Sequence, residues 1–151
     1  MSIKIIASNK KAYHDYFIEQ TFEAGMVLMG TEVKSLRLGH VNIKESFCRI
    51  RNGEVFIDNM TINIYEQGNR ENHEPTRRRK LLLHHLEIDK LIRLTEQKGL
   101  TLLPTKIYFK HSLVKLEIGV GRGKKMHDKR QDLKSKEANR EMSRAIKSAT
   151  R

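Results

Sequence analysis

The first half of the chain has short apolar runs that alternate with polar residues, which is the pattern of β-strands. Residues 16–22 are aromatic and β-branched and predict a strand. Two strand-like runs, 46–51 and 54–57, flank Asn52-Gly53. Asn-Gly between such runs is the strongest short-range signal of a hairpin. Residues 61–65 are a further candidate strand, so this half predicts antiparallel β-structure.

Two short helices and one longer helix interrupt these strands. Asn9 can cap a helix over 10–14, because its side-chain oxygen accepts an orphan backbone N–H. Thr31 can cap a second helix over 32–38 in the same way. Leucine and isoleucine recur at helical spacing over 81–100, which predicts the longer helix there.

The remaining segments complete a small β-domain. Residues 66–80 are polar and predict a long surface loop. Residues 100–109 and 113–120 predict two closing strands, and Pro104 indicates an edge or a bulge in the first of them. About six strands in hairpin order with an inserted helix predict a mainly β fold with flanking helices, an OB-like closed antiparallel β-barrel.

Positive charge is distributed unevenly along the chain. The 151 residues include 30 Lys+Arg and 18 Asp+Glu, a formal net charge of +12. Residues 122–151 hold 11 basic and 4 acidic side chains (net +7), which leaves 19 and 14 (net +5) for residues 1–121. The last segment has too few large apolar residues to offset its ordering entropy. We therefore expect a folded domain over 1–121 and a basic tail over 122–151 that is disordered in the free protein.

The sequence argues against membrane, secreted and enzymatic classes. No apolar run of about 18 residues predicts a membrane span, and residues 1–13 lack the apolar stretch of a secretory signal. The single cysteine, Cys48, is better explained as a small buried hydrophobe than as a nucleophile. His84 and His85 are adjacent and form no metal-binding pair, and GVGRGK at 119–124 lacks phosphate-loop spacing. We expect a cytoplasmic protein with no catalytic residue, no metal site and no cofactor.

Several basic clusters favour nucleic-acid binding. Lys34 and Arg37 are three residues apart and share a face of the expected helix. Residues 77–80 form a second cluster, and residues 10–11 form a third. Lys and Arg bind phosphates without reading sequence, and His14 could stack on an unpaired base. Each cluster taken alone is also compatible with an ordinary solvated surface.

Four sequence blocks resemble the SsrA-binding protein family, also called the small protein B family. They are EAG at 23–25, GTEVKSLR at 30–37, PTRRRKLLL at 75–83 and GKKMHDKR at 123–130. The resemblance implies a bacterial RNA-binding adaptor that is not an enzyme. It would bind the tRNA-like domain of transfer-messenger RNA and deliver it to stalled ribosomes for trans-translation, in which the nascent chain is tagged and the ribosome is rescued. It also implies that elongation factor Tu and alanyl-tRNA synthetase act on the same RNA.

The resemblance assigns an RNA-binding face to the folded domain. Arg37 and Lys115 would bind phosphate, and Glu23 would accept a hydrogen bond from a 2′-OH or a base amino group. Leu82 would contact a base or ribose, which fits the argument that three consecutive leucines cannot all be buried on one side. With Lys34 added from its charge alone, the expected set is Asn9, His14, Glu23, Lys34, Arg37, Leu82 and Lys115.

The resemblance also assigns a role to the tail, which would become helical on the ribosome. It would enter the empty mRNA channel past the decoding centre and replace the missing codon–anticodon pairing. His127 would stack on a ribosomal RNA base, the basic residues would hold phosphates, and Gly123 would let the chain bend. The expected tail set is Gly123, Lys124, Lys125, His127, Asp128, Lys129 and Arg130.

Two other functions stay open on the residues alone. One is a general ribosomal or assembly RNA-binding protein. The other is a small nuclease on an OB-like barrel, which would need convergent carboxylates and a metal, and a metal-dependent RNA cleavage assay separates it from an adaptor. It is also open whether Glu23 contacts RNA or orients Arg37.

Overall fold

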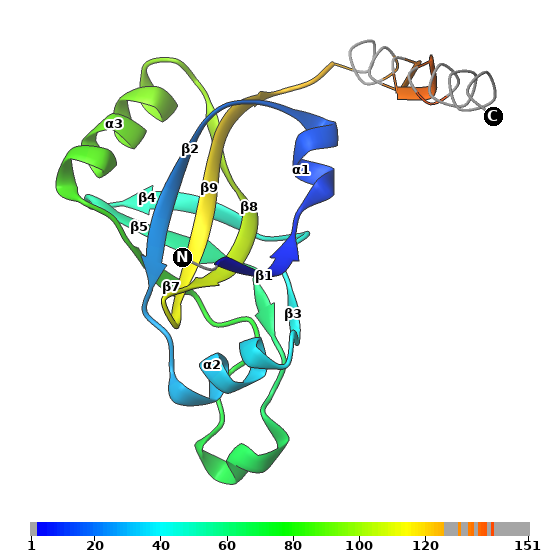
Figure 1. Ribbon diagram of the computed structural model, residues 1–151. Coiled ribbons are helices and arrows are strands. Elements are labelled where there is room, and N and C mark those ends of the chain that lie inside the picture. Colours follow the sequence, from blue (N-terminus) through cyan, green and yellow to red (C-terminus); the bar gives the residue numbers. More distant parts are fainter. Residues whose placement is uncertain (1–2, 126–129, 131–132, 135, 139, 141–151) are drawn as a thin grey trace, which may run out of the picture.

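The computed structural model describes residues 3–125, 130, 133–134, 136–138 and 140. An antiparallel sheet dominates it, with α1 and α3 near one end and α2 at the other (Figure 1). In chain order the elements are β1 (Ile3–Ser8), α1 (Lys10–Asp15), β2 (Tyr16–Met26), α2 (Gly30–Arg37), β3 (Val41–Asn42), β4 (Phe47–Arg51), β5 (Glu54–Asp58), β6 (Thr61–Ile62), a 3-10 helix (Glu66–Glu71), β7 (Arg79–Leu82), α3 (His85–Glu96), β8 (Thr101–Lys110) and β9 (Leu113–Gly123).

The main sheet has seven strands in the order β1-β8-β9-β2-β7-β5-β4. The mainly β architecture with flanking helices is confirmed, but the prediction of a closed barrel is wrong. Closure would require a ladder between the edge strands β1 and β4, and the sheet order ends at those two strands. Strand β3, which lies between them in the chain, pairs with β6 in a separate two-stranded sheet.

Several local predictions are confirmed. The Asn9 side chain accepts a hydrogen bond from the Ala12 N–H (3.3 Å) and caps α1. Asn52 and Gly53 have φ values of 52° and 74°, as the turn between β4 and β5 requires. The register between β8 and β9 shifts just after Pro104, which is the bulge that the proline indicated.

Other predictions are wrong at the level of boundaries. Thr31 lies inside α2, whose N-cap is Met29, and the Glu32 carboxylate accepts a hydrogen bond from the Met29 N–H (2.8 Å). The expected long helix is split into β7 and the shorter α3. Leu81 pairs with Val55 on one side and Met26 on the other, so sheet formation overrides helical periodicity there.

Further departures concern the segments at 3–8 and 66–80. The strand β1 was not expected from the sequence, and its Ile3 and Ile5 side chains are exposed at the sheet edge. The expected loop over 66–80 contains the 3-10 helix and the start of β7.

The core lies on the inner face of the sheet, where α3 covers it with Leu91 and Leu94. Cys48 is part of this core, and burial raises the pKa of its thiol, as expected for a small hydrophobe rather than a nucleophile. On β9, a side chain at position 121 would collide with the Phe17 carbonyl oxygen. The glycine there therefore serves close strand packing.

The boundary expected at residue 121 falls inside strand β9. Strand β9 continues to Gly123, which pairs with Tyr16. The Lys124 N–H then donates to the Asp15 carbonyl (2.8 Å) at the end of α1. His127, Asp128 and Lys129 of the expected tail set lie outside the described residues, and the expected disorder of the tail stays a prediction.

Candidate nucleic-acid interface

Three of the expected residues meet on the outer face of the sheet. Gly25 on β2 pairs with Leu82 on β7 and with Lys115 on β9, so all three side-chain positions share one face. Glu23 precedes Gly25 by two residues and lies on the same face. Gly25 places no side chain between Leu82 and Lys115, and a Cβ at that position would lie 3.4 Å from the Leu82 Cβ. We call Glu23, Leu82 and Lys115 the outer patch.

Leu82 supplies the apolar part of the outer patch. Of the three consecutive leucines, Leu81 is 1% exposed and Leu82 is 50% exposed. The expectation that one of them is exposed is confirmed. An exposed leucine beside a cation and a carboxylate offers both apolar and polar contacts to a nucleotide.

Glu23 is held by β8. The Tyr108 hydroxyl donates to its carboxylate (2.6 Å), and the Lys110 ammonium lies 3.3 Å away. The Tyr108 hydrogen bond holds the pKa of Glu23 below its usual value against partial burial, with Lys110 and Lys115 adding to the effect. Burial and the Glu23 carboxylate raise the pKa of Tyr108. Glu23 is therefore ionised and oriented by Tyr108 and Lys110.

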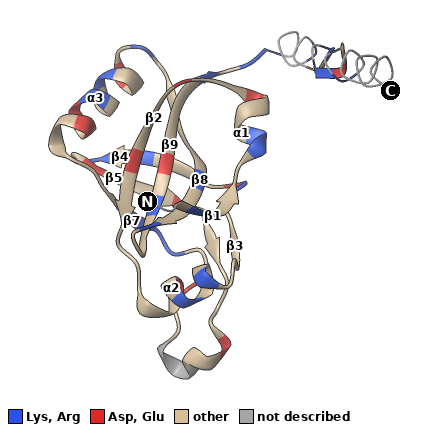
Figure 2. Ribbon diagram, viewed as in Figure 1, with Lys and Arg blue, Asp and Glu red and all other residues tan. Residues whose placement is uncertain are grey.

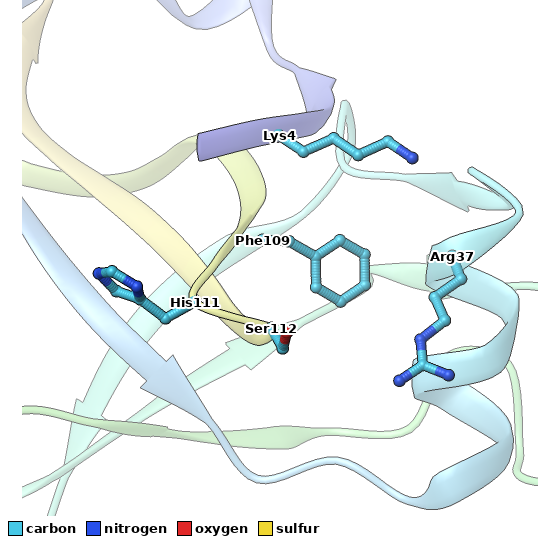
Figure 3. A pocket seen from close by; sticks show the side chains of 5 residues that line it. All are labelled: Lys4, Arg37, Phe109, His111 and Ser112. Carbon is cyan, nitrogen blue, oxygen red and sulfur yellow. The ribbon is translucent and has the colours of Figure 1, made fainter. Parts of the chain in front are cut away.

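Arg37 lies at the C-terminal end of α2, beside the turn between β8 and β9. It lines a pocket of about 330 Å³ together with Lys4, Phe109, His111 and Ser112 (Figure 3). The same turn begins at Lys110, which binds Glu23 on the outer face. Arg37 and the outer patch thus flank one turn at the α2 end of the sheet.

Asn9 and His14 belong to the other end of the sheet. Both polar groups of the buried Asn9 side chain bond within the domain, to the Ala12 N–H and to the Pro104 carbonyl (3.1 Å). His14 Nδ1 lies 2.9 Å from the Asp15 carboxylate, close to where β9 ends at Gly123. Lys115 and Gly123 are eight residues apart on β9, roughly 26 Å along an extended strand. The structure therefore does not bring Asn9 and His14 to the outer patch.

The basic run at 77–80 is paired within the protein. Arg79 is fully buried and bonds to the buried Glu32 carboxylate (2.5 Å), which also binds Arg77. Burial raises the pKa of Glu32, but hydrogen bonds from Arg77, the Met29 N–H and Arg79 leave it below its usual value. Arg78 pairs with Asp58 (2.9 Å) and Lys80 with Glu54 (3.3 Å). This cluster, expected from charge alone to bind nucleic acid, fastens α2 and β5 to β7.

Lys34 and the start of the tail are also engaged. The Lys34 ammonium lies over the Tyr65 ring, 5.4 Å from its centroid. The Lys124 ammonium donates to the Tyr13 carbonyl (3.1 Å) and lies 5.0 Å from the centroid of the Phe17 ring. Lys and Arg positions are distributed over the helices, several strands and the segment that follows β9 (Figure 2).

Sequence reasoning missed several residues of the candidate interface at the α2 end. Lys4, Phe109 and Ser112 join Arg37 only through the pairing of β1 with β8 and the turn after Lys110. Their one local signal was the short connection, 110–112, between the two expected closing strands. The contact of Tyr108 with Glu23 was likewise not predictable from the sequence, because it depends on the sheet order.

Neither a cluster of metal-ligating side chains nor a membrane-spanning helix is found in the described part of the chain. No group of three or more His, Cys, Asp or Glu side chains there could hold a metal ion. None of the helices in that part is long and apolar enough to span a membrane.

Comparison with known proteins gives consistent matches along nearly the whole chain. The SmpB protein family model matches residues 6–148. The SsrA-binding protein of Syntrophotalea carbinolica is 66% identical over 147 residues, which covers 97% of this chain and 98% of that protein. That of Anoxybacillus flavithermus is 60% identical over 144 residues, covering 95% and 94% respectively.

A solved structure agrees with these matches. It is described as "tmRNA-SmpB: a journey to the center of the bacterial ribosome", and one of its chains is 50% identical to this protein. The alignment has a TM-score of 0.66 and covers 80% of this chain and 85% of that chain. From the family match and these relatives, we conclude that the chain belongs to the SmpB protein family.

Proposed function

We propose that this protein binds the tRNA-like domain of transfer-messenger RNA and delivers it to stalled ribosomes for trans-translation. The observation that carries the proposal is the 66% identity, over nearly the full chain, to an SsrA-binding protein. The similar solved structure, described as tmRNA-SmpB in the bacterial ribosome, supports the ribosomal part. In this role the protein is a cytoplasmic RNA-binding adaptor rather than an enzyme. Elongation factor Tu and alanyl-tRNA synthetase act on the same RNA.

The α2 end of the sheet is the surface that we propose for this RNA. Arg37 and Lys115 are cations that neutralise phosphates, and Leu82 presents an exposed apolar side chain beside them. Glu23 is ionised, so it accepts hydrogen bonds and repels phosphate. A carboxylate at that position favours contact with a 2′-OH or a base amino group, which favours RNA over DNA.

Asn9, His14 and Lys34 have separate parts in the proposal. Asn9 acts indirectly, by fixing α1 to β8 through the Pro104 carbonyl. His14 on α1 contacts RNA at the end of the sheet where the tail begins. Lys34 precedes Arg37 by one helical turn and extends the positive surface of α2.

The tail forms the second RNA surface in this proposal. Residues 123–130 enter the empty decoding centre and the mRNA channel, with His127 stacking and Lys125, Lys129 and Arg130 on phosphates. The bonds of Lys124 to the Asp15 and Tyr13 carbonyls fix where the tail leaves the domain. The tail thus starts from a defined position next to α1.

Truncation after Lys125 tests the division between the two surfaces. This cut keeps β9 and the Lys124 contacts, whereas a cut after Val120 would remove residues 121–123, which pair with β2. We expect the truncated protein to bind the tRNA-like domain nearly as well as the full chain. It should not support peptide tagging in a reconstituted translation system programmed with an mRNA that lacks a stop codon. Tagging at the full-length level would overturn the role of the tail.

A binding comparison tests the RNA assignment itself. The full chain should bind the tRNA-like domain more tightly than an RNA hairpin of equal length and charge, at the same salt concentration. Equal affinity for the two RNAs would favour a general RNA-binding protein instead.

A further inference from the structure

The pocket at the α2 end combines an aromatic face with two cations. Lys4 on β1 is the register partner of Phe109 on β8, so their side chains lie on the same face of the sheet. Figure 3 shows the Phe109 ring between Lys4 and Arg37, with Ser112 beside it. Phe109 lies two residues beyond the buried Ile107, packs against the edge of the core and is only partly buried. Its ring therefore closes the core on one side and lines the pocket on the other.

The turn that borders this pocket has an unusual composition. His111 and Ser112 both have positive φ values, 52° and 65°, in the two-residue connection between β8 and β9. The connection between β4 and β5 has the same backbone form and uses Asn52-Gly53, the pair that suits it. Residues that break a local backbone preference are found most often at functional sites. The β8–β9 turn thus holds two non-glycine side chains in a backbone conformation that has a conformational cost.

We propose that this pocket binds one unpaired nucleotide of the RNA. The base lies against the Phe109 ring, Arg37 and Lys4 hold its flanking phosphates, and the Ser112 hydroxyl is available for a hydrogen bond. Stacking of unpaired bases on aromatic side chains, combined with cations on the backbone, is how proteins commonly hold single-stranded RNA. The volume of about 330 Å³ lies at the small end of the range for ligand pockets, as one nucleotide requires. This inference rests on the proposed function and adds a base-binding site to its phosphate contacts.

A tryptophan at position 109 provides a direct reporter, because the chain has no tryptophan of its own. We expect the fluorescence of Phe109→Trp to be quenched when the tRNA-like domain of transfer-messenger RNA is added. The matched control is Leu86→Trp, which places the indole at an exposed position on α3, a helix to which we assign no RNA contact. Quenching in both variants or in neither would overturn the proposal.

The affinity of Phe109→Leu tests the stacking contribution. Leucine keeps the apolar contact with the core but has no aromatic face, so we expect roughly tenfold weaker binding to the tRNA-like domain. Replacing each unpaired loop nucleotide in turn by an abasic one should identify a single position at which the wild-type protein and Phe109→Leu bind equally well. If every abasic RNA preserves the difference between the two proteins, the pocket does not bind a base.

The fold and the proposed function are checked separately. Phe109→Trp retains an aromatic ring and should bind with near wild-type affinity. A folding defect in Phe109→Leu can be recognised because it would weaken binding to every abasic RNA alike. Wild-type protein that fails to prefer the tRNA-like domain over a hairpin would contradict the proposed function. Wild-type preference with an unchanged affinity in Phe109→Leu would contradict only the pocket.

Discussion

The basic run at 77–80 and the separate cations at the α2 end of the sheet make opposite use of positive charge. The run has four consecutive basic residues, and each one pairs with a carboxylate of the domain. Arg37, Lys4 and Lys115 come from three different elements and surround the turn between β8 and β9. Charge density along a sequence therefore does not show which cations are paired with carboxylates within the fold. Under the proposed function, the surface that faces RNA is the one at the α2 end and not the densest basic run.

Sheet geometry explains the difference between the two regions. Arg79 and Leu81 lie on the same face of β7, and Leu81 belongs to the core. Arg79 is therefore directed inward, where its charge requires partners. Glu32, the Met60 carbonyl and the Pro75 carbonyl supply them. The run stabilises the α2 end on which the proposed RNA surface is built.

The largest effect is expected when the buried pair is broken. Arg79→Met keeps much of the side-chain volume but leaves the Glu32 carboxylate buried with fewer donors. Removal of one partner of a buried ion pair costs about 3–5 kcal/mol of unfolding free energy. Urea denaturation would measure this loss, with Arg78→Met as the matched control. Arg78 is half-exposed in its pair with Asp58, so its replacement should cost less than about 1 kcal/mol.

The contrast between the basic run and the α2 end would be contradicted if Arg79→Met and Arg78→Met lost similar amounts of unfolding free energy. It would also be contradicted if Arg78→Met weakened RNA binding as much as a substitution at Arg37. In either case the ion pairs of the run would not be what holds α2 and β5 to β7.

A smaller effect, on binding instead of stability, is expected from Arg37→Ala. Loss of one phosphate contact should weaken binding to the tRNA-like domain by roughly tenfold at low salt. It should also reduce the slope of log K against log salt by roughly one. A salt titration of Arg37→Ala beside Arg78→Ala provides the matched comparison, because both remove one arginine. An unchanged slope in Arg37→Ala would show that Arg37 touches no phosphate.

The sequence predicted features whose signals are local. The Asn9 cap, the Asn52-Gly53 turn and the bulge after Pro104 each depend on a few adjacent residues, and the structure confirms them. The exposure of one leucine within 81–83 followed from the alternation of side chains on opposite faces.

The sequence could not predict features that depend on pairing between distant strands. The leucine spacing after residue 80 favours a helix, but β7 forms because β2 and β5 flank it. Lys4 reaches Phe109 only through the register of β1 with β8. Of the residues that the resemblance assigned to one RNA face, Glu23, Leu82 and Lys115 are adjacent only because Gly25 pairs with two strands at once.

The smallest effect is expected from Tyr108→Phe, which separates the orientation of Glu23 from its charge. Phenylalanine keeps the buried ring and removes the hydroxyl that donates to Glu23. The Lys110 contact remains, so we expect only a two- to threefold loss of affinity for the tRNA-like domain, of the size of one modest hydrogen bond. The pKa of Glu23 should rise toward its ordinary value of 4.5, and a carboxyl-detected NMR titration would measure this rise.

The lowered pKa of Glu23 also predicts how the stability difference between wild type and Tyr108→Phe changes with pH. Glu23 has a lowered pKa in the folded protein, so its hydrogen bond contributes stability that is fully present above pH 4.5. That contribution is lost as the pH falls through the folded-state pKa and the carboxylate is protonated. The stability difference between wild type and Tyr108→Phe should therefore narrow below pH 4.5. A difference that stays constant across that range would mean that the contribution of the Tyr108 hydroxyl does not depend on the ionised Glu23 carboxylate, and that Lys110 alone orients Glu23.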